Sequence, residues 1–231
     1  RKDLRAAVES AQAAAAKWGG TTGYLRGQIV YRIAEMLEGR RASFEAIVPA
    51  EEVDAAIDLT VSLAGWSDKA SQVLGGSNPV AGPYHNFTIP GPMGVQAAVC
   101  PDAPALLGLV GTVLPALVVG CPVVALVSRR CPQAVVFAEV LATSDVPGGA
   151  ASLLTGDLAE LAPHLASHRS IASIVAVGCE PDDRVVLERG AAENLKRVHC
   201  LDAPSDAADW PSLELIEHAL EYKTIWHPSA V

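Results

Sequence analysis

The sequence has few charged residues and no run of basic ones. Only 19% of its 231 residues are charged, whereas 50% are hydrophobic. A chain with this balance buries a substantial core, which argues against intrinsic disorder. The net charge is -9, and an acidic chain has no long-range attraction to phosphate backbones or anionic lipid. We therefore expect neither nucleic acid nor a membrane surface among its partners.

Cysteine pairs and metal-binding patterns are also missing. No two cysteines have CxxC spacing, and the six histidines include no HExxH pattern. The five cysteines are Cys100, Cys121, Cys131, Cys179 and Cys200. Most of them lie in or beside apolar runs, so we expect buried, reduced thiols in a reducing compartment such as the cytoplasm. No metal site is expected.

One long uncharged segment, residues 103–128, has the length of a membrane span. Pro115, Gly120 and Pro122 interrupt it, and a valine-rich run follows Gly120. These features predict a helix that ends at Gly120 and then a buried strand, not a membrane span. The sequence shows no signal peptide and does not begin with Met, so we expect a fragment of a longer chain.

The chain divides into four parts by its patterns. Residues 1–75 show apolar residues at helical spacing and predict a group of helices. Residues 76–94 are rich in Gly and Pro around a β-prone segment, which predicts an arm that reaches another subunit or, equally, a surface loop. Residues 95–203 predict a Rossmann-like, cofactor-type domain. Residues 204–231 predict a linker, a helix over 209–222 and a last strand at 223–227.

The third part alternates strictly between short apolar strands and helices. The expected strands cover residues 94–100, 122–128, 151–156, 170–178 and 195–201. All but the last precede a helix, which is typical of an α/β fold with a parallel, Rossmann-like, five-stranded sheet. Right-handed crossovers place helices on both of its faces. Ligands of such sheets bind at the carboxyl ends of the strands.

The loops at those ends supply the candidate cofactor-binding residues. They are Asp102, Ser128, Arg129, Arg130, Gly178 and Cys179. Asp102 either contacts a ligand or caps the helix that begins near Pro104. The two arginines either meet phosphates or remain solvated. The glycine precedes a helix, where a pyrophosphate can sit, but the carboxylates that follow repel phosphate.

No catalytic group stands out. Cys200 follows His199, but neighbouring residues of a strand point to opposite faces, so the two cannot form a nucleophile and base. The sequence contains neither a GxSxG nor a Walker loop.

The order of the segments resembles the aldehyde dehydrogenase superfamily over nearly the whole chain. The segments that carry the resemblance are LRAAVESAQAAAAKWGGTTGYLRG, GPYHNFTIPGPMGVQAAVCPDAPALLGLVG, VPGGAASLLTGD, NLKRVHCLDAP and EYKTIWH. In that family the segment that EYKTIWH resembles is an oligomerisation strand, and the segments before it belong to a cofactor domain. The resemblance therefore implies NAD or NADP as the possible cofactor.

The family's functional positions are altered here. The resemblance places a supporting asparagine at Asp102, and a ribose-binding lysine and glutamate at Leu126 and Arg129. Gly178 and Cys179 stand where the family has Gly-Ser. A carboxylate at residue 102 opposes a developing oxyanion, and leucine donates no hydrogen bond.

The resemblance places the family's general base at Leu201 and the double glycine after it at Ala203 and Pro204. The catalytic domain that should follow, with its nucleophilic cysteine, is replaced by a short linker. This arrangement is similar to the second, non-catalytic half of family-16 type aldehyde dehydrogenases.

We therefore predict a pseudoenzyme domain with no catalytic residue and no required cofactor. It would serve structure and assembly through residues 76–94 and 223–227, with a second copy or a catalytic aldehyde dehydrogenase domain as partner. Two alternatives stay open: a module that binds NAD(P) without turnover, and an NAD(P)-dependent dehydrogenase completed by another chain.

Overall fold

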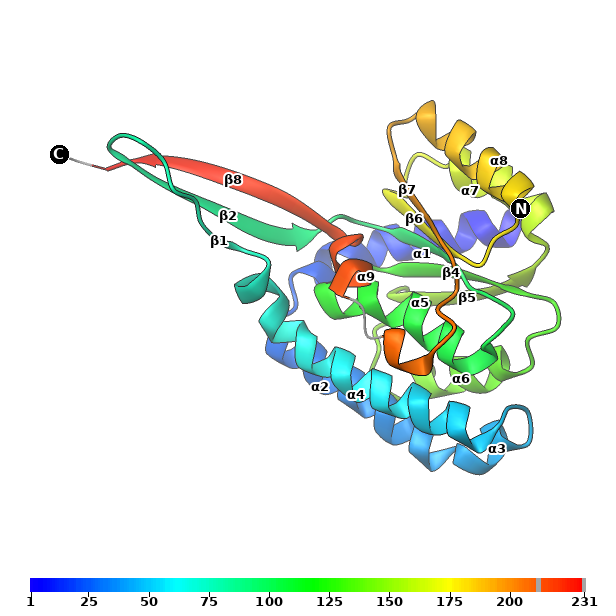
Figure 1. Ribbon diagram of the computed structural model, residues 1–231. Helices are drawn as coiled ribbons and strands as arrows, with labels where there is room; N and C mark the ends of the chain where they lie inside the picture. Colours follow the sequence, from blue (N-terminus) through cyan, green and yellow to red (C-terminus); the bar gives the residue numbers. More distant parts are fainter. Residues whose placement is uncertain (211–212, 230–231) are drawn as a thin grey trace.

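The computed structural model describes residues 1–210 and 213–229, which form an α/β body and a long β-arm (Figure 1). The body contains a five-stranded sheet in the order β5-β4-β3-β6-β7, with all neighbours parallel. Its strands are β3 (Gln96–Val99), β4 (Val123–Ser128), β5 (Ala151–Gly156), β6 (Ser173–Val177) and β7 (Arg197–Leu201). The predicted fold class is confirmed.

The central strands β4, β3 and β6 are buried on both faces because they are apolar on both sides, whereas the edge strands β5 and β7 are half-buried. In β4, Val123 and Val127 belong to one core cluster, whereas Val124 and Leu126 belong to the other. Helices α5 (Ala105–Val119) and α6 (Gln133–Ala142) cover the first face. Helices α7 (Leu158–Ser167) and α8 (Pro181–Ala192) cover the second face together with α1 (Lys2–Gly19). The predicted crossovers on both faces are therefore confirmed.

The uncharged segment is the central part of this core. Helix α5 is buried along almost its whole length and ends at Gly120, whose φ of 97° is left-handed. Strand β4 follows at once, as predicted. Within residues 1–210 and 213–229, no helix combines the length and the apolar character that a bilayer crossing requires.

The other N-terminal helices pack outside α5. They are α2 (Gly23–Gly39), α3 (Arg41–Glu45) and α4 (Ala50–Val73). Thr22 caps α2 by accepting a hydrogen bond from the Leu25 amide.

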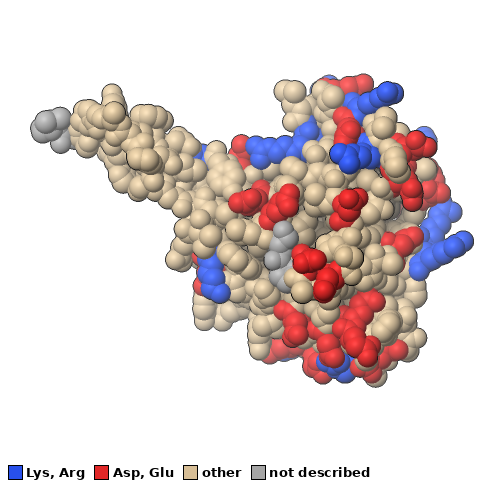
Figure 2. Space-filling model, in the orientation of Figure 1, with Lys and Arg blue, Asp and Glu red and all other residues tan. Residues whose placement is uncertain are grey.

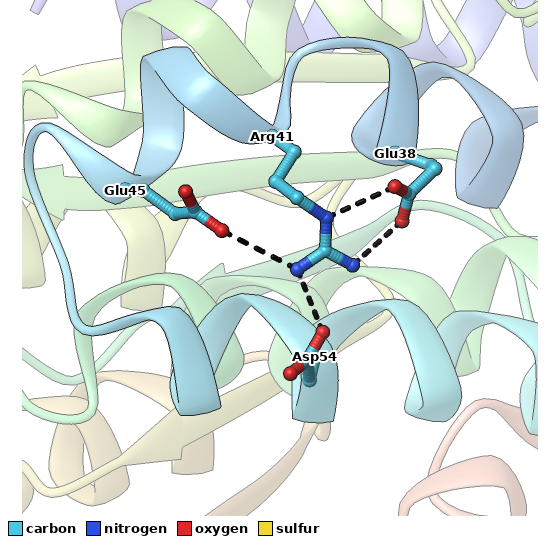
Figure 3. Close-up of polar contacts among 4 residues, drawn as sticks. All are labelled: Glu38, Arg41, Glu45 and Asp54. Atoms are coloured by element: carbon cyan, nitrogen blue, oxygen red, sulfur yellow. Dashed lines mark hydrogen bonds and ion pairs between the residues drawn. The ribbon is translucent and has the colours of Figure 1, made fainter.

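Arg41 joins all three of these helices (Figure 3). Its guanidinium donates two hydrogen bonds to Glu38 at 2.7 and 2.9 Å and one to Asp54 at 2.7 Å, with a longer one of 3.4 Å to Glu45. The hydrogen bonds that Arg41 donates to Glu38 and Asp54 raise the pKa of Arg41. The cluster therefore ties the turn between α2 and α4 to both helices, at a position open to solvent.

The arm is a three-stranded antiparallel sheet in the order β1-β2-β8. It comprises β1 (Gly76–Ser77), β2 (Tyr84–Pro92) and β8 (Leu220–Pro228). Strand β2 pairs with β8 from Tyr84↔Pro228 to Pro92↔Leu220. The predicted arm and last strand are thus partners of each other.

The root of the arm is fixed to the body by Arg197 of β7. Its guanidinium donates to the Leu220 carbonyl at 3.0 Å and to the Glu221 carboxylate at 3.0 and 3.2 Å. Beyond this root the arm extends away from the body (Figure 1).

The helix predicted over residues 209–222 is largely wrong. A 3-10 turn, η1 (Ala207–Asp209), and a short helix, α9 (Leu213–Glu217), occupy this region, and the strand β8 already begins at Leu220. Residues 211 and 212 lie outside the described residues. The reason is long-range pairing: residues 220–222 bond to β2, and this ladder prevails over the local helical pattern.

Trp210 holds the connection between β7 and β8 onto the body. Its side chain is 1% exposed and packs over the two glycines Gly108 and Gly111 of α5. A Cβ atom added to Gly111 would lie 2.2 Å from the indole Cε3, so only glycine allows this approach. The connection therefore packs back on the domain that precedes it.

Candidate functional site

A cavity of about 620 Å³ opens at the carboxyl edge of the five-stranded sheet. It lies at the ends of β3, β4, β5 and β6, and its lining includes all six predicted site residues: Asp102, Ser128, Arg129, Arg130, Gly178 and Cys179. The helices after β3 and β6 run on opposite faces, so their strand ends form the crevice where such sheets bind ligands. The topology alone predicted this convergence.

Asp102 is exposed and does not cap α5. The capping alternative for this residue is wrong, because Glu52 of α4 takes that role. Its Oε1 accepts hydrogen bonds from the amides of Leu106 and Leu107 at 2.6 and 3.1 Å. Sequence analysis missed Glu52, since a cap supplied from a distant helix leaves no local pattern. Asp102 therefore lines the cavity and accepts no capping hydrogen bond from the described residues of α5.

The two arginines lie at the solvent side of the cavity. Arg129 faces Glu160 of α7 at 3.8 Å, and its side chain is 70% exposed. A pair this open contributes little to stability. Ser128 accepts a hydrogen bond from the Arg130 amide at 3.3 Å, which shapes the turn after β4. Both guanidinium groups therefore remain available to a ligand.

Gly178 turns the chain at the end of β6. Its φ of 68° is left-handed, and an added Cβ would lie 3.3 Å from Pro101. The glycine lets the β6–α8 loop pass close to the loop after β3, beside the N-terminus of α8.

Carboxylates surround that helix terminus. Asp157, Glu180 and Asp183 line the cavity together with Asp102. Burial, followed by the charges of Asp157 and Asp182, raises the pKa of Asp183. Asp157 also caps α7 by accepting from the Ala159 amide at 3.0 Å. The field at the helix N-terminus is thus negative, which opposes a pyrophosphate.

No pair of nucleophile and base forms at the cavity within the described residues. The thiol of Cys100 is buried, and burial raises its pKa far above the ordinary range. The His199 ring stacks on His218 with centroids 3.6 Å apart, while Cys200 packs against the core of the other face. The prediction that His199 and Cys200 point apart is confirmed.

A larger hollow of about 900 Å³ lies between α2 and α4. Its lining shares no residue with the cavity at the carboxyl edge and includes none of the predicted site residues. Its side chains include the exposed rings of Tyr24 and Tyr31. Over residues 1–210 and 213–229, no group of three or more His, Cys, Asp or Glu side chains is arranged to hold a metal ion.

The family model described as "Aldehyde dehydrogenase family" matches residues 1–202. The chain belongs to this family. Among curated relatives, cytosolic aldehyde dehydrogenase 1 of Macroscelides proboscideus is 27% identical over 214 residues, covering 86% of this chain and 42% of that protein. Hydroxyisobutyraldehyde dehydrogenase of Mycolicibacterium austroafricanum is 29% identical over 199 residues, covering 81% of this chain and 39% of the relative.

Solved structures of aldehyde dehydrogenases share the fold. One from Burkholderia cenocepacia, described as putative, superposes with a TM-score of 0.80 and 26% identity over 86% of this chain and 44% of its own. Betaine aldehyde dehydrogenase of Staphylococcus aureus, solved with NAD+, gives a TM-score of 0.78 at 21% identity over 86% of this chain and 41% of its own. The chain thus spans less than half the length of these proteins.

Two of the aldehyde dehydrogenase positions that the resemblance pointed to, the ribose-binding lysine and the general base, are leucines here. Leu126 lines the cavity and is buried, with its Cδ1 3.3 Å from a Cβ added to Gly156. Leu201, at the expected place of the general base, is partly buried and packs against the core that contains α5. Both side chains contribute packing, and neither can exchange a proton or bond to a ribose.

Proposed function

We propose that this aldehyde dehydrogenase family chain is a non-catalytic module that assembles with another chain through its β-arm. The observation that carries the proposal is the open edge of β8. This strand lies at the edge of the arm sheet, and residues 221–228 are exposed. An uncovered edge strand of this length is a template for pairing with another chain.

The register identifies which backbone groups are open. The Met93 amide donates to the Ala219 carbonyl and the Ser229 amide to the Pro83 carbonyl, so odd-numbered residues bond to β2. In an antiparallel ladder the bonding alternates from residue to residue. The amides and carbonyls of Tyr222, Thr224 and Trp226 therefore face the open edge.

The surface of the arm also supports an interface. Residues 74–92 contain no charged side chain, and in β8 only Glu221 and Lys223, near the root, are charged. Figure 2 shows the same contrast, with an almost uncharged arm beside a charged body. Trp226, Ile225 and Ile89 are 59%, 41% and 46% exposed. Aromatic and aliphatic side chains without charges are typical of the centre of an interface.

The short connection after β7 and the leucines at two expected functional positions support the non-catalytic part of the proposal. The connection from β7 to β8 covers residues 202–219 and packs on α5 through Trp210, which leaves no place between these strands for a further domain. The apolar Leu201 and Leu126 stand at the expected base and ribose positions. This arrangement fits a degenerate half of a family-16 type enzyme. All five cysteines are free thiols, which supports a location in a reducing compartment such as the cytoplasm.

Sedimentation equilibrium tests the assembly. We expect the chain to form a complex at micromolar concentration, with a second copy or with an added full-length aldehyde dehydrogenase. Thr224→Pro removes an amide from the open edge but none that bonds to β2, and we expect it to weaken association at least tenfold, or about 1.4 kcal/mol.

Thr224→Ala is the matched control, because it keeps the backbone amide while losing the 2.9 Å contact to Thr88. We expect it to associate nearly as well as the wild type. A chain that stays monomeric both alone and with the full-length enzyme would contradict the proposal.

A second candidate function is NAD(P) binding without turnover, and the cavity at the carboxyl edge supports it. The lining combines Arg129, Arg130 and Gly178 with a volume that suits a nucleotide. Calorimetric titration with NAD and with NADP tests this function. A dissociation constant below about 1 mM, or roughly 4 kcal/mol, would favour it.

Charge at the helix N-terminus provides the control for that titration. Asp183→Asn removes a carboxylate from the cavity lining, whereas Asp182→Asn neutralises a neighbour outside it. If a dinucleotide binds there, the first substitution tightens binding and the second changes it less. No heat with either cofactor would leave assembly as the single role. Aldehyde-dependent NADH formation would instead favour a dehydrogenase completed by another chain.

A further inference from the structure

Two cysteines from neighbouring elements interact with each other, and one of them lines the cavity. Cys179 follows Gly178 at the end of β6, and Cys200 lies in β7, the neighbouring strand. Gly178 donates a hydrogen bond of 2.8 Å to the carbonyl of Leu201, the residue after Cys200. Both thiols pack against the same apolar cluster, on the face of the sheet that bears α7 and α8. The left-handed turn at Gly178 brings residue 179 back over this face.

These thiols differ from the other cysteines in access and environment. Cys100, Cys121 and Cys131 are buried, whereas Cys179 and Cys200 are partly exposed. Burial, then the charge of Cys179 and a hydrogen bond with it, raise the pKa of Cys200 to about 12. Cys179 lines the open cavity and Cys200 does not. We therefore expect a reagent that enters the cavity to meet Cys179 first.

We propose that Cys179 and Cys200 form an oxidisable dithiol whose co-substrate is a low-molecular-weight disulfide. The thiolate of Cys179 attacks one sulfur of the reagent, and a mixed disulfide forms as one small thiolate leaves. Cys200 then gives its proton to water and attacks the Sγ of Cys179. This step forms the protein disulfide and releases the second small thiol. Two protein thiols are oxidised and one small disulfide is reduced to two thiols.

The bond would link the β6–α8 loop to β7 covalently. That loop carries Gly178 and Glu180, which line the cavity, so the disulfide would fix one side of its rim. The site is separate from the arm, and its oxidation requires neither assembly nor a bound nucleotide.

Thiol counting with glutathione disulfide as the probe tests the proposal. Under denaturing conditions the reduced chain presents five thiols, and after oxidation of the folded protein we expect three. Peptide mapping of the wild type should show one link, between residues 179 and 200. Reduction by dithiothreitol should restore all five.

Variants distinguish the two roles. Cys200→Ser lacks the second thiol, so we expect it to stop at the mixed disulfide and gain the mass of one glutathione at Cys179. Cys179→Ser should react far more slowly. The double variant Cys100→Ser/Cys131→Ser is the matched control, because this buried pair lies at the same edge of the sheet and should not affect the loss of two thiols. Five remaining thiols, a link to another cysteine, or a disulfide between two chains would overturn the proposal.

Discussion

Trp210 packs its indole against α5 at a place where no side chain intervenes, over Gly108 and Gly111. Because the ring is fully buried, we expect Trp210→Ala to lower the free energy of unfolding by about 3–5 kcal/mol. Urea unfolding followed by circular dichroism measures this loss. Trp226→Ala is the control, since that ring is 59% exposed and should change the unfolding of the single chain by less than about 1 kcal/mol. Equal losses in both variants would contradict this account of the connection.

Glu52 belongs to α4 but caps the N-terminus of α5. We expect Glu52→Ala to cost about 1–2 kcal/mol, because the amides of Leu106 and Leu107 lose their acceptor. Glu52→Gln keeps an acceptor oxygen and should lose less. The neighbouring Glu51 is exposed, and Glu51→Ala should have little effect in the same urea titration. A Gln variant as unstable as the Ala variant would show that charge, not the hydrogen bonds, dominates.

Between elements, the stacked rings of His199 and His218 join β7 to the turn that leads into β8. Burial, then the charge of His218, lowers the pKa of His199 to about 4, and burial also lowers the pKa of His218. An unfolded histidine binds its proton near pH 6.5. Between these values the unfolded chain binds more protons than the folded one, so stability falls as the pH falls from about 6.5 towards 4.

The variant His199→Phe keeps an aromatic ring in the stack and removes one titrating group. We expect its unfolding free energy to depend less on pH across that window than the wild type's. The slopes of unfolding free energy against pH should differ between the two proteins by less than about 1.4 kcal/mol per pH unit, because both rings are only partly buried. If the unfolding free energies of the two proteins changed with pH in parallel, the stacked histidines would be excluded as the source of the pH dependence.

At the scale of elements, prediction from sequence succeeded where a short apolar run is bounded by turn residues. The apolar runs at 122–128 and 151–156 were both found as strands within a residue of the expected bounds, the first buried and the second half-buried at the sheet edge. It failed at 209–222, where pairing with β2, more than a hundred residues earlier, decides the structure. For the same reason the cap from Glu52 was missed. The cavity was predictable because parallel topology forces the strand ends together.

The described residues form a packed body and an arm in which β8 lies at the sheet edge with residues 221–228 exposed. The body supplies the hydrophobic core that keeps the arm anchored through Arg197, while the arm exposes its edge and its aromatic rings. Our proposal is that this chain uses the aldehyde dehydrogenase fold to present the β-arm, and that the cavity at the carboxyl edge of the sheet has no catalytic role.

Hydrogen exchange of the β8 amides tests this account most directly. The amides of Lys223 and Ile225 bond to β2 and should exchange slowly in every state of the chain. Those of Tyr222, Thr224 and Trp226 face the open edge, so we predict that they exchange slowly in the assembled protein and rapidly after dilution to the monomer. Rapid exchange of these three amides under conditions where the chain is assembled would contradict assembly through the β8 edge.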